Sequence, residues 1–196
     1  MPNFFPREAS LDRIWFSKIG RIVFRRMRRI FVAALFLAIA CQATASELLP
    51  PFGFRWGDGS RRVEAVLNGA KARITDRRQD GNRTIWAVDG LVHPGLRQTV
   101  FTFRDDKLIE VELQYEYNDW SIERYNEQMG VIRRYFDSKY GVGKLVSRTG
   151  ESDSDVMQTL VGYQWMVGST MLELFYFSAE KPPHTFRTIT VDYKSL

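Results

Sequence analysis

The longest regular pattern of apolar and polar positions in the chain runs from Asp119 to Gly141. Its apolar residues recur every three or four positions, which places them on one side of an α-helix. They are Ile122, Tyr125, Met129, Ile132, Phe136 and Tyr140. Asp119 or Ser121 can cap the start of this helix, and Gly141 can take the left-handed conformation that ends it. The spacing therefore predicts an amphipathic helix that packs on a sheet.

Segments with the two-residue period of β-strands lie on both sides of this helix. The predicted strands are residues 71–78, 84–89, 99–104, 108–117, 143–148, 160–167, 171–178 and 186–194. A shorter helix is predicted from Ser60 to Gly69, with Val63, Val66 and Leu67 on one face. The polar segment from Glu151 to Asp155 is expected to be a loop.

Each half of the chain thus reads as one helix followed by four strands. A helix with one apolar stripe and a sheet with one apolar face bury these apolar sides against each other, which gives two layers. The predicted fold class is α+β, with an antiparallel sheet of about eight strands and two helices on one face of it.

The strand at residues 108–117 alternates most regularly. One set of its side chains is apolar or aromatic and should face the helices: Ile109, Val111, Leu113, Tyr115 and Tyr117. The other set should face away: Glu110, Glu112, Gln114 and Glu116. In residues 171–178, one alternate set of side chains contains Glu173 together with Phe175 and Phe177, and it should also face away from the helices.

The formal charge of +5 is concentrated at the N-terminus. Residues 1–45 hold eight Lys and Arg against two Asp and Glu, which leaves 20 basic and 21 acidic side chains in residues 46–196. Nucleic-acid binding requires a net basic surface. We therefore expect no nucleic-acid partner for the region after residue 45.

The N-terminal segment has the three parts of a secretory signal peptide. Arginines up to Arg29 precede an apolar run from Ile30 to Ala40, and Ala43-Thr44-Ala45 fits a cleavage site. This predicts removal of residues 1–45, with a true start at Met27, and one exported domain at 46–196. The protein is then periplasmic or secreted. The alternative is a lipoprotein anchored to the membrane by a lipid on Cys41.

Three stretches carry a resemblance to known proteins: Phe52-Gly53-Phe54-Arg55-Trp56-Gly57 before Ser60, residues 99–108, and residues 135–141. Together they resemble a class of small, mostly uncharacterised exported proteins of the bacterial envelope. The layout of one helix and four strands is also similar to the tandem repeats of the beta-lactamase inhibitor protein. Those repeats carry further helices and disulfides that this chain does not match, so the resemblance implies a layout and no functional residue.

The residue types that support catalysis occur here without their usual context. His93 and His184 sit beside prolines in predicted loops, and there is no nucleophile motif. The paired carboxylates fit a hairpin turn at Asp105-Asp106 and a loop at Asp153 and Asp155. Two separated histidines do not form a usual zinc site. We therefore expect no cofactor and no metal.

The remaining hypothesis is a binding surface. Aromatic side chains on an otherwise polar sheet face are typical of recognition sites. The candidate residues are Glu112, Glu116, Glu173, Phe175 and Phe177. This predicts a non-catalytic exported protein that binds an envelope protein partner. The alternative is a small-molecule hydrolase with a site assembled from scattered polar residues.

Overall fold

The structure is a computed structural model that describes residues 47–153 and 156–196. The predictions for the signal peptide, for Met27 and for Cys41 lie outside the described residues, as does Asp155. The described residues all belong to one unit of the chain, Ser46–Leu196. In this part of the chain no helix is both long and apolar enough to cross a membrane.

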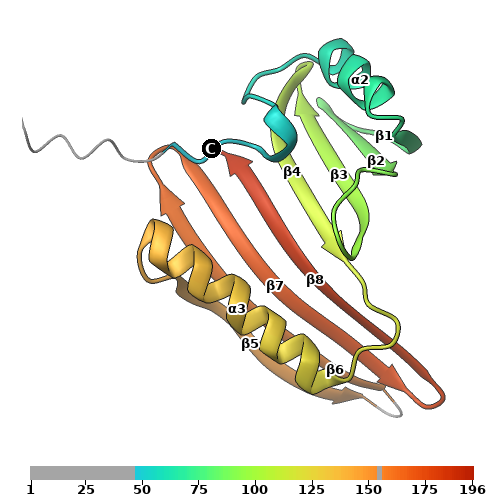
Figure 1. Ribbon diagram of the computed structural model, residues 1–196, viewed down its shortest axis with the longest axis vertical. Coiled ribbons are helices and arrows are strands. Elements are labelled where there is room, and N and C mark those ends of the chain that lie inside the picture. Colours follow the sequence, from blue (N-terminus) through green and yellow to red (C-terminus); the bar gives the residue numbers. More distant parts are fainter. Residues whose placement is uncertain (1–46, 154–155) are drawn as a thin grey trace, which may run out of the picture. The chain divides into compact units, whose positions relative to one another are not determined.

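The described chain forms two α-helices, one short 3-10 helix and eight strands (Figure 1). In chain order these are η1 (Pro51–Gly53), α2 (Ser60–Gly69), β1 (Arg73–Asp80), β2 (Arg83–Asp89), β3 (Leu96–Arg104), β4 (Lys107–Tyr115), α3 (Ile122–Tyr140), β5 (Lys144–Asp153), β6 (Val156–Val167), β7 (Thr170–Lys181) and β8 (His184–Ser195).

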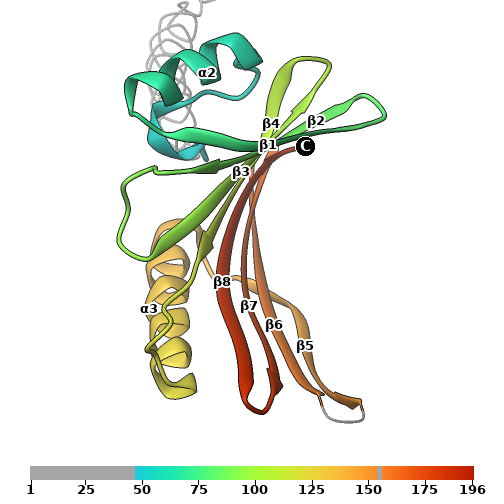
Figure 2. The ribbon, with the colours of Figure 1, turned by 90° about the vertical axis from the view of Figure 1, so that its right-hand side faces the viewer.

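The strands form one antiparallel sheet in the order β1-β2-β3-β4-β8-β7-β6-β5. Its two halves join where β4 pairs with β8, from Glu110 opposite Lys194 to Tyr115 opposite Ile189. Both α-helices lie on the same side of the sheet (Figure 2). The predicted two-layer α+β fold is therefore confirmed. We call the sheet face that carries the helices the inner face, and the opposite one the outer face.

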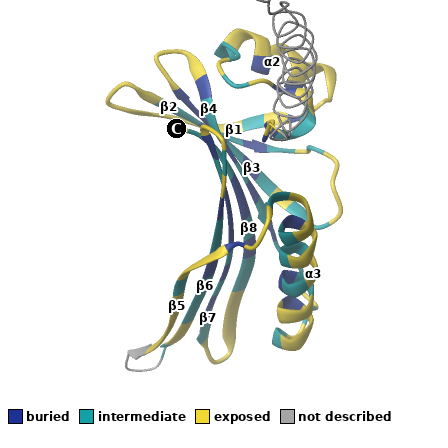
Figure 3. Cartoon of the chain, turned by 90° about the vertical axis from the view of Figure 1, so that its left-hand side faces the viewer, coloured by how far each residue is buried: buried dark blue, intermediate teal, exposed yellow. Residues whose placement is uncertain are grey.

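The buried core lies between the helices and the inner face. Strand residues that point inward are almost fully buried, among them Phe101, Val111, Leu172, Leu174 and Ile189. The side of α3 that faces the sheet is buried and its far side is exposed (Figure 3). This apolar contact is what holds the two layers together.

Helix α3 matches its predicted stripe. Its buried residues are Tyr125, Met129 and Phe136, and Ile122, Ile132 and Tyr140 pack against the core while partly exposed. The hydroxyl of Ser121 accepts a hydrogen bond from the Arg124 N–H at 3.4 Å, which caps the first turn. Gly141 ends the helix with a φ of 86°, a value that favours glycine.

Helix α2 is fixed at its start by a distant turn. The backbone N–H of Ser60 donates to Oδ1 of Asp106 at 3.1 Å. Hydrogen bonding from the side chain and the backbone of Ser60 lowers the pKa of Asp106. Asp105 and Asp106 form the β3–β4 turn with φ values of 51° and 61°. The hairpin interpretation of this pair therefore agrees with the structure.

Burial of α2 is narrower than its sequence pattern suggested. Val63 and Leu67 are buried, but Val66 is 41% exposed. In a helix of ten residues, only the stripe that points at the sheet is covered.

Strand β4 departs from strict alternation at its start. Glu110 pairs with Thr102 while Leu108 pairs with Phe103, so Ile109 is an extra residue at a β-bulge. The bulge puts Leu108, which is fully buried, on the same face as Val111. The prediction that Ile109 belongs to the inward set was wrong for this reason.

Strand β5 is longer than predicted. Its pairing with β6 continues through Glu151 opposite Gln158 to Asp153 opposite Val156. The expected loop over residues 151–155 was therefore wrong for residues 151–153. Polar sequence does not prevent pairing here, because the ladder uses backbone groups and β5 is an edge strand.

A first prediction concerns the packing of α3. Met129→Asp should unfold the domain, because Met129 is 7% exposed and a buried unpaired carboxylate costs several kcal/mol against a typical total stability of about 5–15 kcal/mol. The control is Arg134→Asp at an exposed position of the same helix. The neighbouring Arg133 would be a poor control, because its guanidinium donates a hydrogen bond to the Tyr163 hydroxyl at 3.0 Å. Thermal unfolding checks this, and equal melting temperatures for the two variants would contradict the packing described.

Candidate functional site

The outer face carries a row of charged side chains across three neighbouring strands. The register places Glu110 of β4 opposite Lys194 of β8, and Glu112 opposite Asp192. Glu173 of β7 also lies opposite Asp192. Residues opposite each other in a sheet point to the same face, so these side chains converge. We call Glu110, Glu112, Glu173 and Asp192 the carboxylate cluster.

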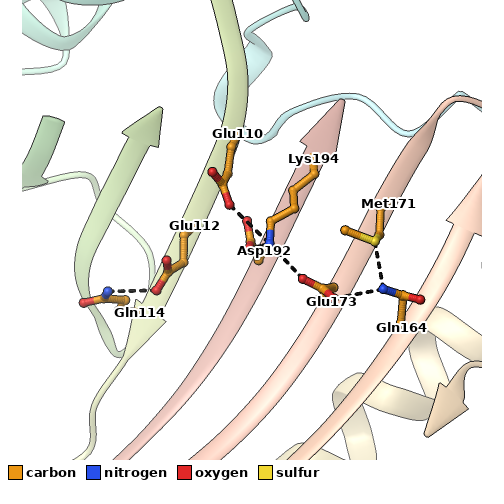
Figure 4. Close-up of polar contacts among 8 residues, drawn as sticks. All are labelled: Glu110, Glu112, Gln114, Gln164, Met171, Glu173, Asp192 and Lys194. Atoms are coloured by element: carbon orange, nitrogen blue, oxygen red, sulfur yellow. Dashed lines mark hydrogen bonds and ion pairs between the residues drawn. The ribbon is translucent and has the colours of Figure 1, made fainter. Parts of the chain in front are cut away.

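Lys194 lies at the centre of this cluster (Figure 4). Its Nζ is 2.6 Å from Oδ2 of Asp192, 2.8 Å from Oε2 of Glu173 and 3.3 Å from Oε1 of Glu110. Three carboxyl groups thus contact one ammonium group, and Glu112 lies on the same face without a contact to it. With three glutamates against one lysine, the formal charge of the cluster is negative whether or not Asp192 is protonated.

Two glutamines hold the outlying carboxylates. Gln114 donates to Oε1 of Glu112 at 2.8 Å, and Gln164 of β6 donates to Oε1 of Glu173 at 3.0 Å (Figure 4). A carboxylate with a fixed hydrogen-bond donor keeps one orientation. These hydrogen bonds therefore fix the positions of the Glu112 and Glu173 carboxyl groups.

Burial alters the charge state of the centre. Burial raises the pKa of the Asp192 carboxyl, Glu110 raises it further, and the hydrogen bond to Lys194 lowers it in part. Burial alone would lower the pKa of Lys194, but hydrogen bonds to Asp192 and Glu173 hold it above its usual value. Oδ1 of Asp192 is buried and has no hydrogen-bond partner among the described residues. The fold therefore holds the Asp192 carboxyl group where its ionised form is costly.

Aromatic side chains continue the outer face along β7 and β8. Phe175 lies against Gly162 of β6, where a Cβ would collide with its ring. Phe177 approaches Phe186 of β8 with ring centroids 6.1 Å apart, and Phe186 is 46% exposed. From Asp192 to Phe186 is six residues, or roughly 20 Å along an extended strand. We call Phe175, Phe177 and Phe186 the aromatic patch.

The structure brings together four of the five residues predicted to bind a partner. Glu112, Glu173, Phe175 and Phe177 all belong to the outer face. Glu116 lies beyond the end of β4, where it lines a separate polar hollow of about 250 Å³ with Trp120 and Arg187 among others. Alternation alone assigned it to the face, but the strand ends one residue earlier.

Sequence reasoning did not select Asp192, Lys194 or Phe186 for this site. All three belong to the alternate set of β8 that begins at Phe186, and this signal was present in the sequence. What the sequence did not supply was the pairing of β8 with both β4 and β7. That pairing is what unites their charges.

The residues considered for catalysis lie apart from this cluster. His93 is exposed and stacks edge-on against Tyr115 at 5.4 Å, and His184 is exposed at the start of β8. Asp105 and Asp106 form a turn, as described, and Asp153 ends β5. Within the described ranges, no three His, Cys, Asp or Glu residues are arranged to hold a metal ion.

A second prediction follows from the raised pKa of Asp192. A carboxyl whose pKa is higher in the folded than in the unfolded chain favours folding while protonated, and this contribution is lost as pH rises from about 4 through the raised pKa. Asp192→Asn removes the dependence, which for one proton is at most about 1.4 kcal/mol per pH unit.

Urea unfolding at a series of pH values measures this difference. The wild-type free energy of unfolding should fall faster with rising pH than that of Asp192→Asn. The control is Asp76→Asn on the exposed strand β1, which also removes one carboxylate. Parallel curves for the wild type and Asp192→Asn would contradict the assignment.

Comparisons of the chain with protein-family models, with curated proteins and with solved structures find no match. The resemblance to envelope proteins therefore stays a prediction from the three stretches that carry it. The fold and the outer face are interpreted from the residues of this chain alone.

Proposed function

We propose that this protein is exported to the periplasm, where it binds another envelope protein without catalysing a reaction. The binding site is the outer face, and the partner contributes a basic segment. The observation that carries this proposal is the carboxylate cluster, in which one lysine contacts three of the four carboxyl groups, on the same face as an aromatic patch.

The charge of the cluster supports a basic partner. Lys194 contacts Glu110, Glu173 and Asp192, while Glu112 is held by Gln114. An approaching Lys or Arg side chain would gain charge-assisted hydrogen bonds and would relieve the repulsion between the carboxylates. An acidic segment would meet an excess of negative charge. The negative charge of the cluster therefore favours a positively charged partner segment.

The aromatic patch supports a protein rather than a lone cation. Phe175 and Phe177 are partly exposed, although they stand on a sheet face with polar neighbours such as Thr188 and Thr190. Aromatic side chains in such settings are typical anchors of interfaces, and truncating an anchor costs 2 kcal/mol or more, roughly thirtyfold in affinity. An extended basic segment about 20 Å long would reach both parts of the face.

The third prediction tests the anchors. Phe175→Ala/Phe177→Ala should weaken binding of a partner from an envelope extract by at least roughly thirtyfold, since the loss of one anchor alone has about that effect. The matched control is Tyr135→Ala, which truncates an exposed aromatic residue of α3. All three baits must first show the same circular dichroism. Equal recovery of the same partners by the wild type and the double variant would contradict the proposal.

The fourth prediction tests the charges. Glu110→Gln/Glu112→Gln should weaken capture of the same partner, and the loss should be larger at low ionic strength, where charges are less screened. The control is Asp119→Asn/Glu127→Gln, which removes two exposed carboxylates before and within α3. Raising the ionic strength from about 0.05 to about 0.5 M should bring the wild type and the first variant together. Capture that is insensitive to salt would contradict a basic partner.

A further inference from the structure

A cavity of about 450 Å³ opens on the inner face, away from the site proposed above. It lies between α3 and the inward side chains of β4 and β8, and the loop between β2 and β3 also contributes to its lining. Among its lining residues are Tyr115, Gln128, Val131, Phe136, Ile189 and Tyr193.

The cavity exists because α3 covers only part of the inner face. The backbone of α3 approaches β6 most closely, and the aromatic rings of Phe136 and Trp165 meet there at 5.4 Å. Strands β4 and β8 lie further along the sheet order, so their inward residues form a floor that the helix borders without filling. Folded interiors seldom leave voids much larger than one water molecule. A space of this size falls in the range of ligand pockets, roughly 300–1,000 Å³.

The lining is free of formal charge. None of the residues that the structure places around the cavity is Asp, Glu, Lys or Arg. The floor is apolar and closed, since Ile189 is fully buried and Val191 is 4% exposed. An ionised ligand would lose its hydration here without gaining a counter-charge. The chemistry of the walls therefore selects an uncharged molecule.

Aromatic rings make up much of the wall, and two of the residues that carry them, Tyr115 and Tyr193, also have hydroxyl groups. Neither Tyr115 nor Tyr193 makes a side-chain hydrogen bond with another described residue. Burial raises the pKa of Tyr115 to about 12 and also raises the pKa of Tyr193, so both phenols stay protonated near neutral pH. A protonated phenol can donate one hydrogen bond. The site thus combines flat apolar walls with hydrogen-bond donors.

We infer that this cavity binds an uncharged aromatic small molecule that carries a hydrogen-bond acceptor. The rings of the ligand stack among the tyrosines and Phe136, and its acceptor lies near the hydroxyls of Tyr115 and Tyr193. Offset or edge-on ring contacts contribute beyond area burial, which favours an aromatic over an aliphatic ligand. This function is independent of the outer face, so either can hold without the other.

Fluorescence titration of the full chain with prodan, an uncharged naphthalene ketone that brightens in apolar sites and whose carbonyl is a hydrogen-bond acceptor, tests the inference. The wild type should enhance the emission in a saturable way. Val131→Trp places a large side chain at the cavity from a position that is 47% exposed, so the fold should tolerate it. It should weaken binding at least tenfold. The matched control, Arg134→Trp, adds the same ring to α3 outside the lining and should bind as the wild type does.

A second variant covers the case in which Val131→Trp loses the wild-type circular dichroism. Gln128→Trp then replaces it, because this substitution fills the cavity from another lining position. Naphthylmethanol should displace the probe better than decanol does. No saturable enhancement with the wild type, equal binding by wild type and filled variants, or displacement by decanol alone would each overturn the inference.

Discussion

The antiparallel pairing of β4 with β8 is the contact on which both faces of the sheet depend. It joins two units of one helix and four strands into a single eight-stranded sheet. On the outer face it sets Glu110 opposite Lys194, and on the inner face it sets Leu113 opposite Val191. One register thus produces an acidic row on one side and an apolar floor on the other. A shift by one residue would exchange the two faces.

Much of the fold could be predicted because the hydrophobic periodicity of a short segment indicates both its secondary structure and the side that it buries. The stripe of α3, its start at Ser121 and its end at Gly141 follow from spacing and capping preferences within about twenty residues. The alternation in β7 likewise placed Glu173, Phe175 and Phe177 on one face. The exceptions are also local. The bulge at Ile109 shifts the inward–outward alternation of β4 by one residue, and no glycine marks its position in the sequence.

The site was less predictable because it depends on contacts between distant segments. Glu110 and Lys194 are far apart in the chain, and only the strand order brings Oε1 of Glu110 to 3.3 Å from Nζ of Lys194. The apolar cavity combines His93, Gln128 and Tyr193 from three separate elements, each of which has an ordinary packing or surface role when considered alone. Periodicity shows which way a side chain points. It does not show which strand is its neighbour.

The two strands at the ends of the sheet order, β1 and β5, each pair with a neighbouring strand on one side only. An open sheet has unpaired backbone groups along each edge that could extend into a neighbouring copy. Strand β1 is largely exposed and densely charged, with Arg73, Asp76, Arg77, Arg78 and Asp80 in eight residues. Strand β5 begins with Lys144 and contains Arg148 and Glu151. Charged edges of this kind disfavour edge-to-edge growth from one copy of the chain to the next.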